Sequence, residues 1–223
     1  MTGPGAPAPR LIEVDPARLG RWVDGFAERH GTLRWTTPEG EPGVVRLVAD
    51  DGSVADLQTW PAPDSAAVPT SRRELVGWGS PPQTLGLVLL RRGGYAVGRA
   101  SGDRLVDHKC GTRYVQSRTA AGGWSQQRFA RRRGNQADAL VGTVTDLVLD
   151  RLGGAGLEGL VAGGDKALVR QVLAEPRLAD LTGLPRREFY DIPDPRLTVL
   201  EHALRRGRAV RVRLRESASA VGD

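Results

Sequence analysis

One segment restricts the fold of this chain more than any other. Thr84–Arg91 (TLGLVLLR) is a short, nearly continuous apolar run that follows the helix-breaking sequence Ser80-Pro81-Pro82. A run of this length is typical of a β-strand that is buried on both faces of its sheet. The chain has 223 residues, of which 39% are hydrophobic and 26% charged, so a sizeable core is expected and wholesale disorder is excluded.

The elements after this strand predict a mixed sheet. Two further strands, at 95–100 and 104–109, follow glycine-containing turns and complete a three-strand meander. Helices and strands then alternate. Helices are expected at 137–152, 165–173 and 194–205, and strands at 157–162, 188–192 and 209–215. The core stripe of the first helix is expected to be Leu140, Val144, Leu147 and Leu152. This order is typical of a sheet with helices on its faces, as in ribonuclease-H-like folds.

The first third of the chain predicts a separate, small α+β domain. A helix is expected at 15–29 and strands at 32–36, Val44–Ala49 and 54–60, followed by a stretch rich in Pro, Ala and Ser at 61–69. Residues 1–14 are expected to be a disordered tail. We therefore expect an α+β domain over residues 15–80 and a second domain over residues 83–217.

Several classes of protein are excluded by what the sequence lacks. The single cysteine, Cys110, allows no internal disulfide and no cysteine-rich zinc site, and the three histidines are widely separated. Thr84–Arg91 carries no carboxylate, which argues against a metal-dependent nuclease of this fold. No apolar run approaches the length of a membrane span, and no signal peptide is visible. We expect a cytoplasmic monomer that needs no metal or cofactor and has no membrane partner.

Positive charge is concentrated in one segment. Residues 109–137 contain no acidic side chain and seven basic ones, a charge of +7 against +6 for the whole chain. The seven are Lys109, Arg113, Arg118, Arg128, Arg131, Arg132 and Arg133. Such a concentration is what binding to nucleic-acid phosphates requires. A second arginine set near the C-terminus alternates with apolar residues, which predicts the solvated face of an edge strand.

The basic segment also contains a candidate for chemistry. Gly122 and Gly123 allow the backbone to approach another molecule closely, and Trp124 offers a stacking face or packs the loop against its own domain. Ser125, Gln126 and Gln127 follow and provide two amides beside the arginines. A long loop of this composition suits an RNA-lined site, although composition alone equally allows a solvated basic loop.

Two other features predict ordinary structure. His108 lies close to Cys110, but no third group that would orient a catalytic thiol is evident. Gly163-Gly164-Asp165-Lys166 lacks the full phosphate-loop pattern and predicts a strand-to-helix turn.

The loop resembles that of a known family. In archaeal and eukaryotic class-1 translation release factors the middle domain carries Gly-Gly-Gln and then an Arg-Phe-Ala-Arg-x-Arg run. Gly122-Gly123 and the run from Arg128 to Arg133 resemble these motifs, whereas Trp124 stands where the glutamine would be. Ser125-Gln126 resembles the displaced glutamine of the Vms/ANKZF peptidyl-tRNA hydrolases. The chain therefore resembles a bacterial, actinobacterial-type member of that branch, with weaker similarity over residues 84–215.

The resemblance implies an enzyme that hydrolyses the ester between a nascent peptide and tRNA on a stalled large ribosomal subunit, without a cofactor. The implied catalytic residues are Gln126, Gln127, Gly122, Gly123 and Ser125, with Gln126 preferred over Gln127 as the reacting amide. The implied contacts to rRNA or tRNA are Trp124, Arg113, Arg118, Arg128, Arg131, Arg132 and Arg133. Two alternatives stay open: a non-enzymatic ribosome-binding protein, and cleavage near the tRNA 3′ end in place of the ester.

Overall fold

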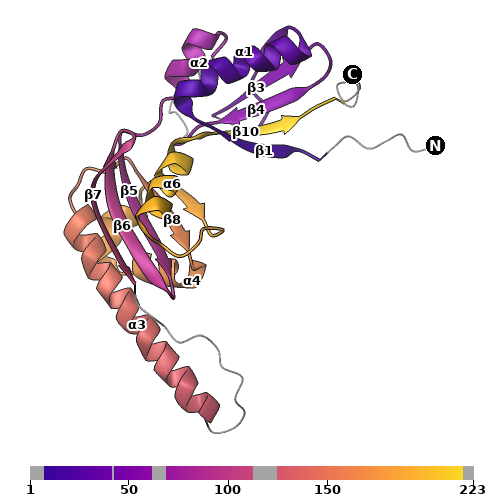
Figure 1. The fold of residues 1–223 in the computed structure, drawn as a ribbon. Helices are drawn as coiled ribbons and strands as arrows, with labels where there is room; N and C mark the ends of the chain where they lie inside the picture. The colour runs from indigo at the N-terminus through magenta and orange to yellow at the C-terminus, as the bar shows by residue number, and fades with distance from the viewer. Residues whose placement is uncertain (1–7, 42, 62–68, 113–124, 218–223) are drawn as a thin grey trace. The chain divides into compact units, whose positions relative to one another are not determined.

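The computed structural model describes residues 8–41, 43–61, 69–112 and 125–217 (Figure 1). The chain divides into two compact units, one made of residues 1–81 and 208–223 and the other of residues 82–207. Each unit has its own five-stranded sheet, and the two hydrophobic cores share no residue in the described ranges. The mixed α+β class expected from the sequence is confirmed.

The sheet of the second unit combines an antiparallel meander with a parallel extension, in the order β7-β6-β5-β8-β9. β5 (Thr84–Arg91), β6 (Gly94–Ser101) and β7 (Arg104–Thr112) form the meander, and β8 (Gly159–Gly164) and β9 (Arg186–Phe189) run parallel to β5. β5 is the central strand and is buried from its second to its seventh residue, as its apolar run predicts.

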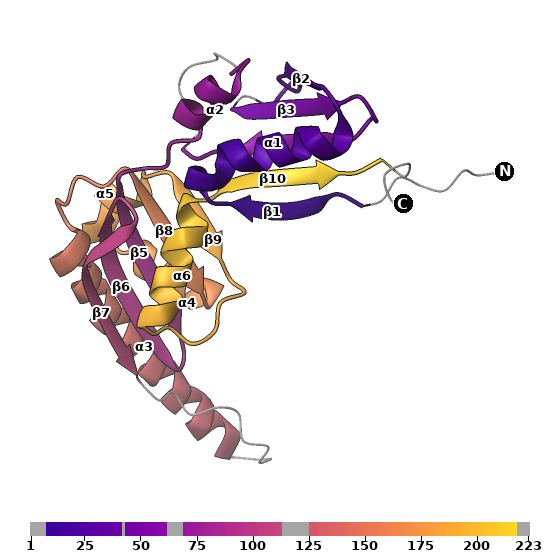
Figure 2. The same ribbon diagram turned by 45° about the horizontal axis from the view of Figure 1, so that its top comes forward.

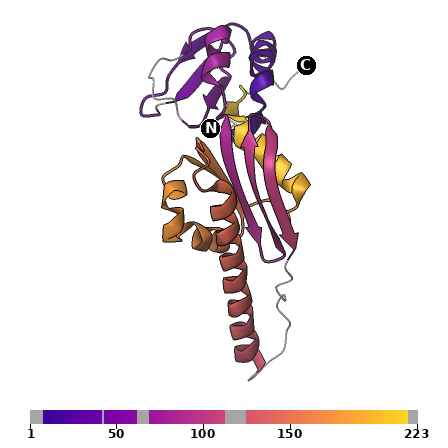
Figure 3. The ribbon, with the colours of Figure 1, turned by 90° about the vertical axis from the view of Figure 1, so that its left-hand side faces the viewer.

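Helices cover both faces of this sheet (Figure 3). The helices on one face are α3 (Ser125–Leu152), α4 (Lys166–Leu173) and α5 (Ala179–Thr182), preceded by the 3-10 turn Pro176–Leu178, and α6 (Leu197–Arg208) lies on the other. Val88 and Leu90 of β5 join the core beneath α3 and α4. α6 approaches so closely that a Cβ at Gly98 would lie 2.9 Å from Leu200, which explains a glycine at this position of β6.

The first unit is an antiparallel sheet with two helices, in the strand order β1-β10-β4-β3-β2. The strands are β1 (Arg10–Val14), β2 (Leu33–Thr36), β3 (Val44–Ala49), β4 (Val54–Gln58) and β10 (Val210–Arg215). The helices are α1 (Leu19–His30), which follows the 3-10 turn Pro16–Arg18, and α2 (Arg72–Trp78). Figure 2 shows α1 along one face of the sheet, where Leu19, Val23 and Phe26 are buried against strand residues.

Two of the expected domain assignments are corrected. Residues 1–14 are not a disordered tail throughout, because Arg10–Val14 form β1 and pair antiparallel with β10. The last strand does not belong with residues 83–207 and is not an edge strand, because β10 lies between β1 and β4 of the first unit. The alternation in β10 specifies which side chains are buried but carries no information about the sheet that the strand joins.

Candidate nucleic-acid interface

The C-terminal half of α3 is fixed to the core of the second unit. Leu140, Val144, Val148 and Leu152 recur at helical spacing and are fully buried. Three of these were predicted, but Val148 takes the place of Leu147, which is only partly buried. An ion pair between Arg151 and Asp107 of β7 adds a polar contact. The sequence gives no signal for that pair, since its members are 44 residues apart.

The N-terminal half of α3 extends beyond the sheet (Figures 1 and 3). The helix has 28 residues, which corresponds to a length of about 42 Å. It begins at Ser125, whereas we expected a loop as far as Arg133 and a helix from residue 137. The intervening Gln, Arg and Ala residues are good helix formers, so the helix includes the last part of the basic segment, residues 125–137.

Only some of the predicted reactive and basic residues belong to this helix. Gln126 and Gln127 both belong to its first turn, where backbone N–H groups have no partner within the helix and the helix dipole is positive. Four predicted RNA contacts follow along the same helix, and they are Arg128, Arg131, Arg132 and Arg133. Three consecutive helical positions cannot share one face, because successive residues are about 100° apart.

The remaining predicted residues lie outside the described part of the chain. These are Gly122, Gly123, Trp124, Arg113 and Arg118, and for residues 125–135 the description covers the backbone alone. The choice between Gln126 and Gln127 therefore stays a prediction.

Cys110 lacks the properties of a catalytic thiol. It lies half-buried on β7, and burial raises the pKa of its thiol. The thiolate is the nucleophilic form of cysteine, so a raised pKa lowers the reactive fraction.

The glycine-rich end of β8 is a strand-to-helix turn, as predicted. The carboxylate of Asp165 caps α4 by accepting hydrogen bonds from the backbone of Ala167 and Leu168, at 3.0 and 3.3 Å. Gly164 has a φ of 105°, and a Cβ there would lie 2.2 Å from the carbonyl oxygen of Leu90. The sequence Gly163-Gly164-Asp165-Lys166 thus serves the local fold.

The described residues form neither a cluster of metal ligands nor a membrane-spanning helix. Among them, no group of three or more His, Cys, Asp or Glu side chains is placed to hold a metal ion. None of the helices described is both long and apolar enough to cross a membrane.

Comparison with known proteins identifies the family. Residues 83–213, more than half of the chain, match the actinobacteria/chloroflexi VLRF1 release factor family, acVLRF1. The chain belongs to the acVLRF1 family of release factors. The match extends over nearly all of the second unit and continues into β10 of the first. It therefore includes α3 and the whole basic segment.

Solved structures with similarity to this chain include two proteins with related descriptions. One is the Vms1 mitochondrial localization core, with 11% identity, a TM-score of 0.45 and coverage of 87% of this chain and 80% of that one. Another is the archaeal translation termination factor aRF1, with 12% identity, a TM-score of 0.33 and coverage of 89% and 64%. A comparison with curated proteins gave no match. The family assignment rests on the sequence match of residues 83–213.

Proposed function

We propose that this acVLRF1 protein is a peptidyl-tRNA hydrolase that releases nascent peptide on stalled large ribosomal subunits in the cytoplasm. One observation carries the proposal: a chain that matches a release-factor family over residues 83–213 has Gly122-Gly123 in its sequence, and Gln126 and an arginine run belong to the N-terminal half of α3. The family match supports a role in translation, and the amide of Gln126 is the side chain proposed to take part in the reaction.

The proposed chemistry is hydrolysis of an ester by water. Water attacks the carbonyl carbon, the bond to the terminal ribose oxygen of tRNA breaks, and the proton released by the water is taken up by that oxygen. The products are a peptide with a free carboxylic acid, which then loses its proton to the solvent, and a tRNA with a free hydroxyl. An amide side chain does not titrate near neutral pH, so Gln126 would orient the water and would not act as a base.

In this proposal, backbone N–H groups of α3 stabilise the negative charge that develops on the carbonyl oxygen during the reaction. The N–H groups in the first turn of α3, which have no partner within the helix, are donors at the positive end of a helix dipole. Donors that are fixed before the reaction are worth most where water is excluded, as in a site enclosed by rRNA. Gly122, Gly123 and Ser125 would give the adjoining backbone the conformation that this approach needs.

The length of α3 supports a role in reaching into RNA. Its C-terminal half is anchored by four buried side chains, while its N-terminal half extends past the sheet. A rigid helix that projects from a folded unit can carry a reactive segment into a narrow site. In this proposal Arg128 and the three arginines from Arg131 to Arg133 neutralise phosphates around the helix, with Arg113, Arg118 and Trp124 as further RNA contacts.

The test is release of labelled peptide from peptidyl-tRNA on isolated large subunits, with the ends of the product tRNA mapped. Gln126→Ala is expected to reduce release on the order of 10²-fold or more at unchanged ribosome occupancy, because a positioned polar group is lost. Gln127→Ala, the matched variant one residue further, is expected to have the smaller effect.

Three outcomes would contradict parts of the proposal. Full release by both alanine variants at equal occupancy would refute the glutamine mechanism. Binding without release by the unaltered protein would make it a docking protein. A tRNA shortened at its 3′ end would show that the bond cleaved is not the ester.

A further inference from the structure

The sheet of the first unit presents arginines on the face away from its helices. α1 and α2 both pack with the hydrophobic core, which contains Val210, Val212 and Leu214 of β10. Side chains alternate along a strand, so Arg211, Arg213 and Arg215 lie on the opposite face. Register places Arg46 of β3 and Arg34 of β2 on the same face, two and three strands away from β10. We call the set the arginine face, and it consists of Arg34, Arg46, Arg211, Arg213 and Arg215.

A buried carboxylate organises the centre of the arginine face. The side chain of Asp56 on β4 is only 2% exposed, yet it contacts three guanidinium groups. Nε and Nη2 of Arg46 donate to its two oxygens at 2.5 and 3.0 Å. Nε of Arg213 and Nη2 of Arg215 lie 3.5 and 3.7 Å away. This hydrogen-bonded pairing raises the pKa of Arg46.

Two carboxylates hold Arg213, because its Nη2 also donates a hydrogen bond of 2.7 Å to Glu41, while Asp56 contacts Arg46 and Arg215 as well. Asp56, Glu41 and Glu13 provide three negative charges on this side of the sheet against five arginines, which leaves an excess of positive charge. The side chains of Arg213 and Arg215 are 47% and 45% exposed. Guanidinium groups that are held in place lose less entropy when a further anion binds.

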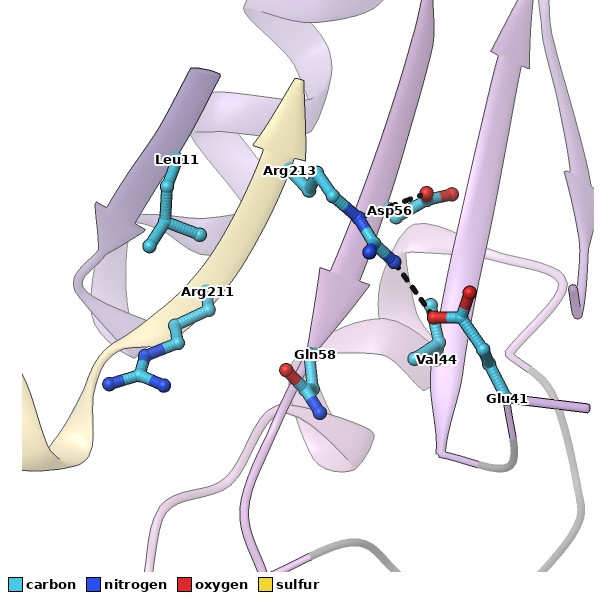
Figure 4. Close-up of a pocket in the computed structure, with 7 residues that line it drawn as sticks. All are labelled: Leu11, Glu41, Val44, Asp56, Gln58, Arg211 and Arg213. Atoms are coloured by element: carbon cyan, nitrogen blue, oxygen red, sulfur yellow. Dashed lines mark hydrogen bonds and ion pairs between the residues drawn. The ribbon is translucent and has the colours of Figure 1, made fainter. Parts of the chain in front are cut away.

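A hollow of about 240 Å³ lies on the same face, lined by Leu11, Glu41, Val44, Asp56, Gln58, Arg211 and Arg213. Figure 4 shows Arg213 extending from β10 toward Asp56 and Glu41, while Arg211 extends from β10 in a different direction, away from these two carboxylates. Leu11 is 62% exposed and gives the hollow an apolar side. The lining therefore combines cations, one amide and aliphatic surface.

We propose that the arginine face binds the backbone of an RNA strand, with Arg211 and Arg213 each on a phosphate of that strand and Leu11 against a ribose or base. The Cα atoms of residues at alternate positions of an antiparallel strand are about 6.8 Å apart, and the side chains of Arg211 and Arg213 extend in different directions from β10 (Figure 4). The pair can therefore follow one extended, regularly charged strand. Guanidinium groups bind phosphate through two parallel hydrogen bonds. That the RNA is ribosomal or transfer RNA rests on the proposed function.

RNA fits the arginine face better than an acidic peptide does. The amide of Gln58 and the aliphatic surface of the hollow suit ribose hydroxyls and carbon atoms, and the guanidinium groups suit phosphates. The test below includes competition by an acidic peptide, so binding of such a peptide would be detected.

The test is binding of a labelled oligouridylate of about 12 nucleotides, within the usual site size, to the full chain over a range of salt. Arg211→Gln/Arg213→Gln is expected to weaken binding and to reduce the slope of log K against log salt by about 1.4, at about 0.7 for each phosphate contact on a single strand. The control is Arg21→Gln/Arg29→Gln, which removes the same charge from α1 on the other face.

A second variant separates binding from folding. Arg34→Gln/Arg211→Gln leaves all three contacts to Asp56 in place and is expected to reduce the slope by about 0.7, because Arg211 is the one of the two that is assigned to a phosphate. Its thermal stability is measured beside that of the wild type. Both face variants should lose as much binding when Arg131, Arg132 and Arg133 are already glutamine, since the arginine face and α3 contribute separately.

The proposal is overturned if both face variants keep the affinity and slope of the wild type, or if the control loses as much as they do. It is also overturned if a glutamate oligomer of equal charge displaces the RNA as well as unlabelled RNA does, because the occupant is then an acidic peptide. The assay requires no hydrolysis, so failed peptide release with intact face-dependent RNA binding would refute the proposed function alone.

Discussion

At the scale of single residues, Asp51 joins the end of α1 to the turn between β3 and β4. Its Oδ2 lies 2.8 Å from Nδ1 of His30, and its Oδ1 accepts a hydrogen bond of 2.8 Å from the backbone of Ser53. Burial alone would raise the pKa of Asp51, but the hydrogen bonds from His30 and Ser53 lower it more, so the pKa lies below its ordinary value. The ionised carboxylate therefore stabilises the folded first unit.

We expect Asp51→Asn to lower the free energy of unfolding at pH 7 and to lose this effect in acid. The folded-state pKa is below that of the unfolded chain, so the stability contributed by the carboxylate is complete above about pH 4 and is lost as the pH falls through the folded-state value. Urea unfolding between about pH 7 and pH 2 measures this. Asp138→Asn, at an exposed position of α3, is the control. A difference between Asp51→Asn and wild type that stays constant with pH would contradict the assignment.

At the scale of elements, glycines in β5 and α3 have opposite structural roles. A Cβ at Gly86 in the buried strand would lie 2.7 Å from Leu157 and 3.0 Å from Leu160. A Cβ at Gly142 of α3 would have no neighbour within 4 Å, and that residue is exposed. The same substitution therefore has opposite expected signs in the two elements.

Gly142→Ala is expected to stabilise the second unit by about 0.5–1 kcal/mol, because glycine in a helix interior is entropically unfavourable. Gly86→Ala is expected to destabilise it by about 1–3 kcal/mol, because a methyl group is forced into a packed core. Denaturant unfolding of the two variants side by side measures both. A destabilising Gly142→Ala would show that this stretch of α3 is not a regular exposed helix.

The bounds of two strands were predictable from the sequence, whereas the start of α3 was not. Thr84–Arg91 and Val44–Ala49 were predicted with their observed bounds, since apolar patterning is local information. The start of α3 was placed at residue 137 because the basic segment has no apolar stripe, although its residues favour a helix. The candidate site was predicted from its motif, and the side chains of that motif lie outside the described residues.

At the scale of the whole molecule, the sheet of the first unit contains a strand, β10, that is far away in sequence from the other strands of that sheet. β10 pairs with β1 on one side and β4 on the other, and Val210, Val212 and Leu214 are buried in its core. The sequence predicted a strand here but assigned it to the wrong unit, because pairing between segments that are far apart in the chain leaves no local pattern. The ribonuclease-H-like topology of the second unit stays a prediction.

Removing residues 209–223 is therefore expected to unfold the first unit and to leave the second folded. Burial of each of the three lost apolar side chains is worth about 1.5–3 kcal/mol, and their sum is comparable with the total stability of a domain, about 5–15 kcal/mol. Strands β1 and β4 also lose the partner that lies between them. The second unit keeps all its core residues, since none of those described comes from residues 209–223.

Hydrogen exchange of the truncated chain, followed by mass spectrometry, measures this outcome peptide by peptide. Peptides from β3 and β4 should lose their protection, while peptides from β5 and β8 should keep it. Removing only residues 218–223 is the matched control and should change neither set, because β10 ends at Arg215. Protection retained in β3 and β4 after the longer truncation would show that β10 is dispensable to the first sheet. Protection lost throughout would show that the two units fold as one, despite cores that share no residue in the described ranges.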